Sequence, residues 1–378
     1  MIKVIPVSPK IGAEIQGVNI KTLDDAAFRV VYQAFLDHVV IVIRGQDLQE
    51  EDFMAFSSRF GELKPHMTKK AHHPRYPNLM LMDNRILNTQ TGEESKTASP
   101  LLVRIGNVWH TDTSYDYITA KATGMYAVNV PSVGGDTLFS NSYAAYDALP
   151  DSLKQKLEGR SAAHIYGGRL KRQQERLEEE NKNRAPAIHP MTPVHPETGR
   201  KSLYFNDGQI MSIVGLEPAE SDAIIADLAK RTASPDGDYR HKWQKGDVVI
   251  WDNRCSIHCA TGDYPANERR TNWRSTIMEF GWQPQQQHQQ HHTPQYSPRR
   301  STRLRLILLQ RIRYHTPHQK QKQRENQIVE HKPRPLHMLK LLPQDFCCRK
   351  GKHTERNDSQ SIPAHDPEHV KTTQRIQR

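Results

Sequence analysis

The chain has 378 residues, 36% of them hydrophobic, which is enough for one large domain or two modest ones. Its apolar runs fall short of the roughly 18 residues that a membrane-spanning helix needs, and its N-terminus lacks the pattern of a secretion signal. The four cysteines suggest no disulfide framework: Cys255, Cys259, Cys347 and Cys348. We therefore predict a cytoplasmic protein with no membrane partner.

The formal net charge of +11 is concentrated at one end of the chain. Residues 284–378 contain 19 Lys and Arg against 7 Asp and Glu, which leaves 34 basic and 35 acidic residues in positions 1–283. The first 283 residues are thus nearly neutral, as expected of a domain that handles a small molecule.

The first 60 residues alternate between helical and strand patterns. Leu23–Asp37 has helical spacing of its apolar residues, and Val39–Ile43 is a short β-branched run that predicts a buried strand. Glu50–Phe60 predicts a second helix, ended by Gly61. Residues 64–106 are polar and irregular, which is typical of a surface loop and equally of a lid over a site.

Residues 107–283 contain short strand candidates separated by turn signals, a spacing typical of a β-sandwich or jelly-roll barrel. The candidates are Ala122–Val130, Gly135–Ser140, Ala162–Tyr166, Ser202–Phe205, Asp247–Trp251 and Thr271–Glu279. Ser142–Gly159 and Pro218–Thr232 predict helices between them, and the charged segment Arg169–Arg184 predicts a solvated helical insertion. The predicted fold class is therefore α+β, mainly β.

The segment after Pro284 differs in composition from everything before it. It opens with the Gln/His run Gln285–His292 and is rich in Pro, Gln, Lys and Arg. Such a composition buries too little apolar surface to offset the entropy of ordering, so we predict disorder. The chain then divides into a folded domain, residues 1–283, and a basic tail, residues 284–378.

The central motif is Trp109-His110-Thr111-Asp112, followed much later by His258. Residues two apart on an extended strand point to the same face, so His110 and Asp112 can reach one metal ion together. A distant histidine completes a set of two imidazoles and one carboxylate on one face of the metal, the arrangement of non-haem Fe(II) oxygenases. Each part is weak alone, because a single His-x-Asp or a single histidine is commonly an ordinary surface or core residue.

A pair of arginines strengthens this interpretation. Arg270 and Arg274 are four residues apart, so an extended strand puts both on one face. A guanidinium group stays charged and binds carboxylates through two parallel hydrogen bonds, which suits a dicarboxylate cofactor beside the metal.

With these motifs, the sequence resembles the TauD/TfdA family of Fe(II)- and 2-oxoglutarate-dependent dioxygenases, the taurine dioxygenase-like enzymes, over about residues 5–282. The segments that carry the resemblance are Ile11–Val18, Phe60–Leu63, Trp109–Asp112, Gly134–Leu138, His195–Arg200, Gly246–Asp247, Trp251–Arg254 and Arg270–Thr276. The resemblance implies a double-stranded β-helix, the cupin-like jelly roll, with flanking helices.

The resemblance also implies roles for individual residues. His110, Asp112 and His258 would bind the catalytic iron, and Thr137 with Arg270 would hold the distal carboxylate of 2-oxoglutarate. Arg269 is the alternative to Arg270, because the loop after His258 is one residue longer than the family pattern. Arg274 and His66 would contact the substrate.

The activity implied is hydroxylation of a small anionic organic substrate at the expense of O2 and 2-oxoglutarate, with release of succinate and CO2. Ascorbate is expected to support it, and the resemblance suggests a homo-oligomer. Arg274 favours a sulfonate, a sulfate ester or an aryloxy or alkyl carboxylate. The residues after His66 depart from the taurine pattern, and the approach Ile105–Trp109 departs from it too and leans towards the aryloxyacetate-type members.

Other functions compete with this one. A related iron oxygenase could act on a larger metabolite, although the sequence contains no clear aromatic cage for a quaternary amine. A zinc hydrolase could use the same three ligands, but Thr137 and Arg270 would then have no purpose. A nucleic-acid binder acting through the basic tail is the least favoured reading.

Overall fold

The computed structural model describes residues 1–85, 106–169, 179–233 and 236–281, all within one compact unit. Three predictions fall wholly or partly outside this part of the chain: the tail from residue 284, most of the insertion Arg169–Arg184, and the second half of the 64–106 loop.

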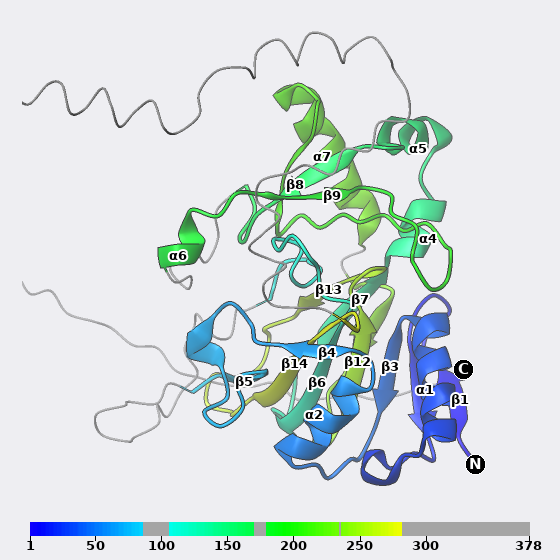
Figure 1. Cartoon of the computed structure of the whole chain (residues 1–378), viewed down its shortest axis with the longest axis vertical. Helices are drawn as coiled ribbons and strands as arrows, with labels where there is room; N and C mark the ends of the chain where they lie inside the picture. Colours follow the sequence, from blue (N-terminus) through cyan, green and yellow to red (C-terminus); the bar gives the residue numbers. More distant parts are fainter. Residues whose placement is uncertain (86–105, 170–178, 234–235, 282–378) are drawn as a thin grey trace, which may run out of the picture. The chain divides into compact units, whose positions relative to one another are not determined.

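The largest sheet has eight strands in the order β1-β2-β3-β12-β6-β14-β4, with β5 also paired to β14 (Figure 1). Neighbouring strands are antiparallel except β2 and β3, which are parallel. The strands are β1 Lys3–Pro6, β2 Ala13–Gln16, β3 Val40–Ile43, β4 Glu62–Lys64, β5 Leu79–Asp83, β6 Ala122–Asn129, β12 Val248–Asp252 and β14 Thr271–Met278.

Both faces of this sheet are buried at its centre, and β12 shows the alternation. Val248 and Ile250 pack in a core cluster with the helices α1 (Asp25–His38) and α2 (Glu50–Ser58), together with the short η1 (Ile20–Thr22). Val249 and Trp251 point the other way, into a second cluster. Side chains alternate between faces along a strand, so a run of apolar residues marks a strand covered on both sides.

The second cluster lies between the large sheet and a three-stranded sheet of order β11-β7-β13. Its strands are β7 Thr137–Asn141, β11 Tyr239–His241 and β13 Ser256–Ala260. Phe139 on β7 packs edge-on against Trp251 of the large sheet, with ring centroids 5.5 Å apart. The two sheets are therefore packed face to face, and β13 carries His258 into the space between them.

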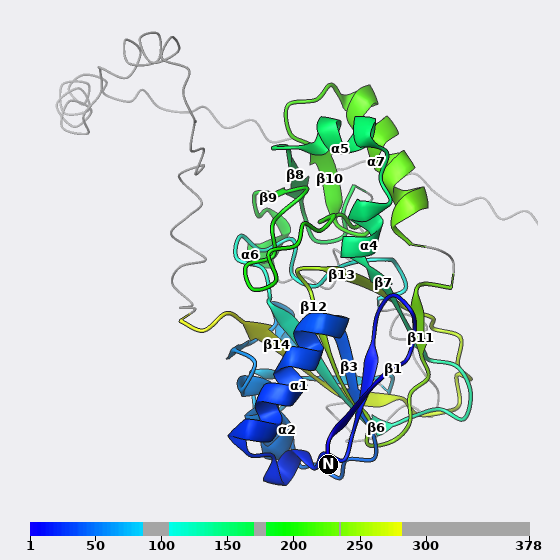
Figure 2. The same ribbon diagram turned by 90° about the vertical axis from the view of Figure 1, so that its right-hand side faces the viewer.

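The remaining elements form a separate layer at the end of the described unit opposite α1 and α2 (Figure 2). A third sheet of order β10-β8-β9 packs there with α7 through a cluster that includes Ile224, Ile225 and Leu228. The elements are α4 Ser142–Asp147, α5 Asp151–Leu157, β8 Ser161–His164, α6 Glu179–Lys182, β9 Ala187–Pro190, β10 Ile210–Ile213 and α7 Pro218–Thr232; a short η2, Lys69–Ala71, precedes β5.

The predicted mixture of helices and a majority of strands is confirmed, and most predicted elements occur within a few residues of their predicted ends. Four predictions are wrong. Leu79–Asp83, predicted as part of an irregular loop, forms the strand β5 against β14. Ser202–Phe205 is not a strand: only the preceding Lys201 forms an isolated bridge, with Val194. The helix Ser142–Gly159 is two helices, because Pro150 interrupts it. Asp112 does not lie in a strand but in a turn.

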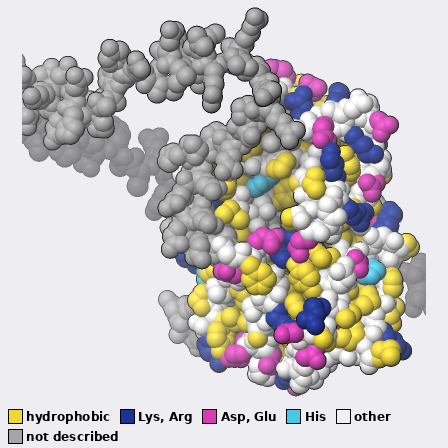
Figure 3. All heavy atoms as spheres, turned by 45° about the vertical axis from the view of Figure 1, so that its right-hand side comes forward, with side chains coloured by type: hydrophobic (Ala, Val, Ile, Leu, Met, Phe, Trp, Pro, Cys, Tyr) yellow, Lys and Arg dark blue, Asp and Glu magenta, His cyan; other side chains and the backbone are white. Residues whose placement is uncertain are grey.

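The surface carries charges of both signs. On the face in Figure 3, acidic and basic side chains are interspersed, which agrees with the near-neutral balance of residues 1–283. Among the described residues, no helix has the length and apolar character needed to cross a membrane.

Candidate active site

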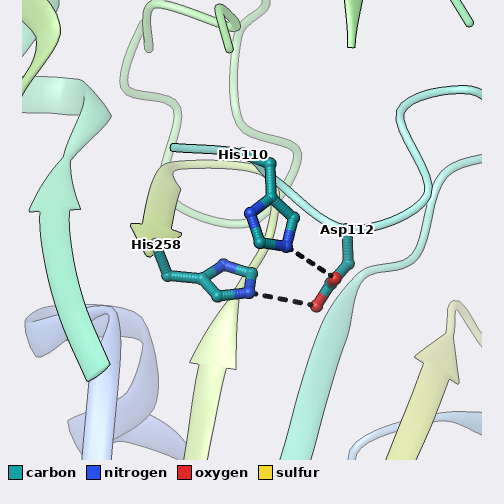
Figure 4. A group of neighbouring side chains, drawn as sticks. All are labelled: His110, Asp112 and His258. Atoms are coloured by element: carbon teal, nitrogen blue, oxygen red, sulfur yellow. Dashed lines mark ion pairs between the residues drawn. The ribbon is translucent and has the colours of Figure 1, made fainter. Parts of the chain in front are cut away.

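The predicted metal-binding residues meet between the two packed sheets (Figure 4). His110 and His258 form an isolated antiparallel bridge, in which each backbone N–H donates to the carbonyl of the other, at 3.0 and 2.8 Å. Asp112 follows in a turn that contains Thr113 at a φ of +58°. A threonine in this left-handed region is strained, and such strain persists where surrounding structure enforces it. Here the Thr113 hydroxyl accepts from the Ala120 N–H at 2.6 Å.

The three side chains present their donor atoms to a common point. The Nε2 atoms of His110 and His258 each lie 3.7 Å from an Asp112 carboxylate oxygen, and one donor atom from each residue lies within 4.8 Å of the others. Metal–nitrogen and metal–oxygen bonds are about 2.0–2.2 Å long, so donors bound to one ion are separated by less than about 4.4 Å. These three residues fit a divalent transition metal.

The hydrogen bonds of His110 fix which nitrogen can bind a metal. Its Nδ1 lies 2.7 Å from the Val108 carbonyl oxygen, which can only accept, so Nδ1 carries the hydrogen. In the neutral ring Nε2 then has a free lone pair directed at Asp112. Burial, followed by the neighbouring His110, lowers the pKa of His258 to about 3, which keeps that ring neutral as a metal ligand requires.

Asp112 is held as a carboxylate by its neighbours. Burial alone would raise its pKa, but the positive charge of Arg274 and the hydrogen bond from Thr123 outweigh burial and hold the pKa below its usual range. Arg274 Nη2 lies 2.8 Å from Oδ1, and the Thr123 hydroxyl donates to Oδ2 at 2.7 Å.

A cavity of about 120 Å³ lies over the three residues. Its lining combines sulfur-containing and aromatic side chains with a few polar groups, which is the usual make-up of a small-molecule site. The apolar part is Met80, Met82, Met125, Tyr115, Tyr166 and Trp251. The polar part includes His66, Thr137, Gln209, Arg270 and Arg274. All the predicted site residues except Arg269 thus share this cavity.

Arg270 and Thr137 are both equipped to donate. Arg270 uses Nε to donate to the Gly135 carbonyl at 3.2 Å, and no carboxylate among the described residues pairs with it. Burial lowers its pKa, although a guanidinium group remains charged. The Trp243 indole N–H, which can only donate, gives its hydrogen to Thr137 Oγ1 at 3.0 Å. Thr137 therefore keeps its own hydroxyl hydrogen for another acceptor.

Gly135 is needed for this arrangement. It has a φ of +70°, and a Cβ atom there would lie 3.2 Å from both Cδ and Nε of Arg270 and from the Tyr264 ring. A larger residue would be strained and would crowd the arginine.

His66 lines the cavity, but both of its ring nitrogens have partners. Nδ1 accepts from the Thr68 N–H at 3.1 Å, and Nε2 lies 3.1 Å from the Tyr115 hydroxyl. Burial, followed by the charge of Arg274, lowers the pKa of His66 to about 3. In the neutral ring Nε2 carries the hydrogen and donates to Tyr115, whose own hydroxyl hydrogen is left for the cavity.

A second cluster of possible ligands, His195, Asp252 and Cys255, is not equipped to bind a metal. His195 Nδ1 accepts from the backbone N–H groups of Glu197 and Thr198, so its Nε2 carries the hydrogen and donates to Asp252 at 3.1 Å. Arg254 also donates to both oxygens of Asp252. The cluster is a buried hydrogen-bonded network that braces the turn before His258.

Several residues near the site were not predicted from the sequence: Tyr115, Thr123, Gln209, Trp243 and Asn253. Asn253 belongs to a motif that carries the family resemblance, and Tyr115 lies three residues after Asp112, so proximity to the motifs was the available signal. Thr123, Gln209 and Trp243 come from segments that only the fold brings near.

A mainly-β fold with two converging imidazoles, one carboxylate and a cavity above them defines a class, the metal-dependent oxygenases. The profile described as "Taurine catabolism dioxygenase TauD, TfdA family" matches residues 3–276. The chain belongs to the TauD/TfdA family, and the prediction of a dioxygenase is confirmed.

Characterised relatives and solved structures agree with this assignment. The (S)-phenoxypropionate/alpha-ketoglutarate-dioxygenase of Sphingobium herbicidovorans is 34% identical over 283 residues, covering 72% of this chain and 94% of the relative. The alpha-ketoglutarate-dependent 2,4-dichlorophenoxyacetate dioxygenase of Cupriavidus pinatubonensis is 30% identical, covering 72% and 96%. AAD-2, solved in complex with Mn(II) and N-oxalylglycine, superimposes with a TM-score of 0.62 at 26% identity, covering 73% of this chain and 98% of that one.

Proposed function

We propose that the protein is an Fe(II)- and 2-oxoglutarate-dependent dioxygenase that hydroxylates a small anionic organic substrate and releases succinate and CO2. One observation carries the proposal: the donor atoms of His110, Asp112 and His258 converge in a cavity that also contains Arg270 and Thr137. A zinc hydrolase would need the three metal ligands but would have no use for Arg270 and Thr137 beside them.

In the proposed site, the two imidazoles and the Asp112 carboxylate hold the metal on one face. Bound Fe(II) supplies the activation of O2 that hydroxylation requires. The chain's own part is to keep the His258 ring neutral, to fix the His110 ring through its Nδ1 hydrogen bond, to hold the carboxylate ionised and to surround the site with apolar side chains that exclude water.

Arg270 and Thr137 are proposed to hold the distal carboxylate of 2-oxoglutarate. The guanidinium group offers charge-assisted hydrogen bonds, and the Thr137 hydroxyl adds another because Trp243 occupies its acceptor position. The names of the relatives support 2-oxoglutarate as cosubstrate, and the Mn(II)–N-oxalylglycine complex of AAD-2 supports a metal and a bound ligand in this type of site.

Arg274 is proposed to attract the acidic group of the substrate. It is buried at 6% exposure, lines the cavity and contacts Met80 Sδ and Asp112. The apolar wall suits an alkyl or aryl body. Relatives named for phenoxypropionate and 2,4-dichlorophenoxyacetate, and an alkylsulfatase of Acinetobacter baylyi at 32% identity, support an aryloxy carboxylate or a sulfate ester. His66 is proposed to act on the substrate through Tyr115.

The finer structural predictions belong to the same proposal. The face-to-face packing of the large sheet and the β11-β7-β13 sheet supports a double-stranded β-helix core. The match over residues 3–276 supports a catalytic domain of residues 1–283 and a separate tail, whose removal would leave turnover intact. Two free buried cysteines, Cys255 and Cys259, support a cytoplasmic location. A homo-oligomer remains a prediction from the family resemblance.

The test is succinate formation from 2-oxoglutarate in air, with Fe(II) and with or without ascorbate. Aryloxyacetates, aryloxypropionates, alkyl sulfates, alkanesulfonates and taurine form the substrate panel. We expect one class of acid to stimulate succinate formation strongly, and we expect His110→Ala to abolish it.

Two outcomes would contradict different parts of the proposal. Slow succinate formation that no acid stimulates, but that His110→Ala still removes, would keep the iron site and exclude the small anionic substrate. Absence of succinate from the iron-loaded wild-type protein would refute the enzyme itself.

A further inference from the structure

A chain of hydrogen bonds runs from the turn after β12 to the carboxylate of Asp112. Asn253 Nδ2 lies 2.9 Å from Thr123 Oγ1, which lies 2.7 Å from Asp112 Oδ2. We propose that Thr123 and Asn253 are positioning residues that orient Asp112 for metal binding. The inference rests on the proposed metal site and adds two residues that do not touch the metal.

The direction of each hydrogen bond follows from the chemistry of the groups. An ionised carboxylate can only accept, so Thr123 must give its single hydroxyl hydrogen to Asp112. The Thr123 oxygen can then only accept from Asn253, whose donor is the amide NH2 group. Each link therefore has one allowed polarity, and the order Asn253 to Thr123 to Asp112 is unambiguous.

The surroundings hold this chain rigidly. Asn253, Thr123 and Asp112 are 1%, 0% and 7% exposed, so water does not compete for their hydrogen bonds. The Asn253 backbone N–H donates to the Lys121 carbonyl at 2.9 Å, and its carbonyl accepts from the Thr111 hydroxyl at 2.7 Å. One residue thus ties together β6, which bears Thr123, and the segment that bears Asp112.

The two carboxylate oxygens of Asp112 have different hydrogen-bond partners. Oδ2 is tethered by Thr123, whereas Oδ1 has Arg274 Nη2 at 2.8 Å. The terminal torsion of an aspartate is intrinsically broad, so loss of the Thr123 hydrogen bond leaves the carboxylate held by Arg274 alone and free to rotate about that contact, away from both imidazoles. Outer hydrogen bonds of this kind change metal affinity by about 10- to 100-fold when removed.

Asn253 carries an unfavourable feature that this role accounts for. Its Oδ1 is buried and lacks a hydrogen-bond partner within the described residues. A buried polar atom without a partner destabilises the fold, and such an atom in a native structure calls for an explanation. The amide is retained, in this view, because its NH2 group orders the Thr123 hydroxyl.

The test uses the full-length protein and Co(II) as the probe metal, with dissociation constants from quenching of tryptophan emission. Trp251 is well placed as reporter, since its ring lies 4.8 Å from the His258 ring. Thr123→Val, which removes the hydroxyl, and Asn253→Ala should each raise the dissociation constant at least about tenfold. Thr123→Ser, which keeps the hydroxyl, should restore wild-type affinity. The visible Co(II) spectrum should change in the first two variants and not in the third.

Asn206 offers a matched control. It is equally buried, its amide also donates to a hydroxyl, that of Ser114, at 3.1 Å, and its Oδ1 also lacks a partner. That hydroxyl donates to Gln209 rather than to a proposed metal ligand. Asn206→Ala should therefore keep the wild-type Co(II) affinity, even if its melting temperature falls as much as that of Asn253→Ala.

A double variant tests whether Asn253 acts through Thr123. Thr123→Val with Asn253→Ala should bind Co(II) no more weakly than Thr123→Val alone. Should Thr123→Val not fold, as judged by circular dichroism, the comparison of Asn253→Ala with Asn206→Ala decides the question.

The outcomes separate this inference from the proposed function. Wild-type protein that binds no Co(II) would overturn the metal site and this inference with it. Tight wild-type binding that is unchanged in Thr123→Val and Asn253→Ala would overturn the positioning role alone.

Discussion

Arg269 and Arg270 are consecutive in the chain, but only Arg270 reaches the cavity. Arg269 is exposed and donates to the Asp83 carboxylate at 2.6 Å, on the neighbouring strand β5. Arg270 points to the other side, where it lines the cavity and donates to Gly135. Successive side chains of an extended segment face opposite ways, so only one arginine of this consecutive pair lines the cavity.

Replacing Arg270 should therefore weaken 2-oxoglutarate binding. Arg270→Gln removes a half-buried charge that would pair with a carboxylate in the cavity, and losing one partner of such a charge pair typically costs about 2 to 5 kcal/mol of binding free energy. We expect the KM for 2-oxoglutarate in the succinate assay to rise at least about 30-fold.

Arg269→Gln is the matched control and should leave that KM within about twofold of wild type, because its Asp83 partner lies outside the cavity lining. The reverse result, a large effect at residue 269 and a small one at residue 270, would show that Arg269 and not Arg270 binds 2-oxoglutarate.

Tyr115 should contribute to substrate binding, with His66 acting behind it. The Tyr115 hydroxyl accepts a hydrogen bond from His66 and keeps its own hydrogen to donate into the cavity. Tyr115→Phe removes this hydroxyl. A hydrogen bond to a charged group is worth about 1.5 to 3 kcal/mol. We expect a rise of about tenfold or more in the KM for the most stimulating acid and an unchanged KM for 2-oxoglutarate.

A double variant distinguishes this arrangement from direct contact by His66. If His66 acts only through Tyr115, adding His66→Gln to Tyr115→Phe produces little further change. Full additivity of the two effects would mean that the histidine binds the substrate itself.

The sequence predicted the residues that converge at the cavity but not the residues that hold them in place, and the reason is physical. His110, Asp112, Arg270 and Arg274 stand in short motifs whose spacing survives any small error in the predicted elements. The expectation that His110 and Asp112 share one strand was wrong, yet both still meet His258, because a bridge and a strained turn give the same convergence.

The supporting residues depend on long-range pairing that spacing does not reveal. Thr123 meets Asn253 because β6 pairs with β12, more than 120 residues away in the chain. The strand β5, predicted as loop, is formed because β14 offers it an edge. Ser202–Phe205 was predicted as a strand because Leu203 and Phe205 are apolar. These two side chains instead pack into the core cluster beside α7, and the segment does not pair with a neighbouring strand. Tertiary context overrides local pattern in each case.

A buried ion triad should contribute strongly to stability. Asp116, 2% exposed, lies 2.6 Å from Lys64 Nζ and 2.8 Å from Arg184 Nη1. Asp116→Asn leaves the two cations without their shared carboxylate, and breaking a buried ion pair in this way costs about 3 to 5 kcal/mol. We expect urea denaturation to show a loss of this size in the free energy of unfolding.

The exposed pair Asp227–Arg231 on α7 provides the comparison, since both side chains are 43% exposed. Asp227→Asn should cost about 0 to 1 kcal/mol in the same experiment. Equal losses in the two variants would show that burial of the triad has no special weight.

His164 should make the folded state sensitive to acid. The side chain is fully buried on β8, and both ring nitrogens lack hydrogen-bond partners among the described residues. Burial, followed by the nearby His189, lowers the pKa of His164 to about 3, against 6.5 for an exposed histidine. Between these values the unfolded chain binds a proton that the folded chain excludes, so stability falls as the pH falls.

The contribution of His164 is fully present above pH 6.5 and is lost as the pH drops towards 3, with a slope of at most about 1.4 kcal/mol per pH unit. His164→Leu removes this proton uptake and keeps a similar volume. We expect urea denaturation at pH 7.5, 6.0 and 5.0 to show a variant that gains stability relative to wild type as the pH falls. A difference that stays constant over the three pH values would refute the role of His164.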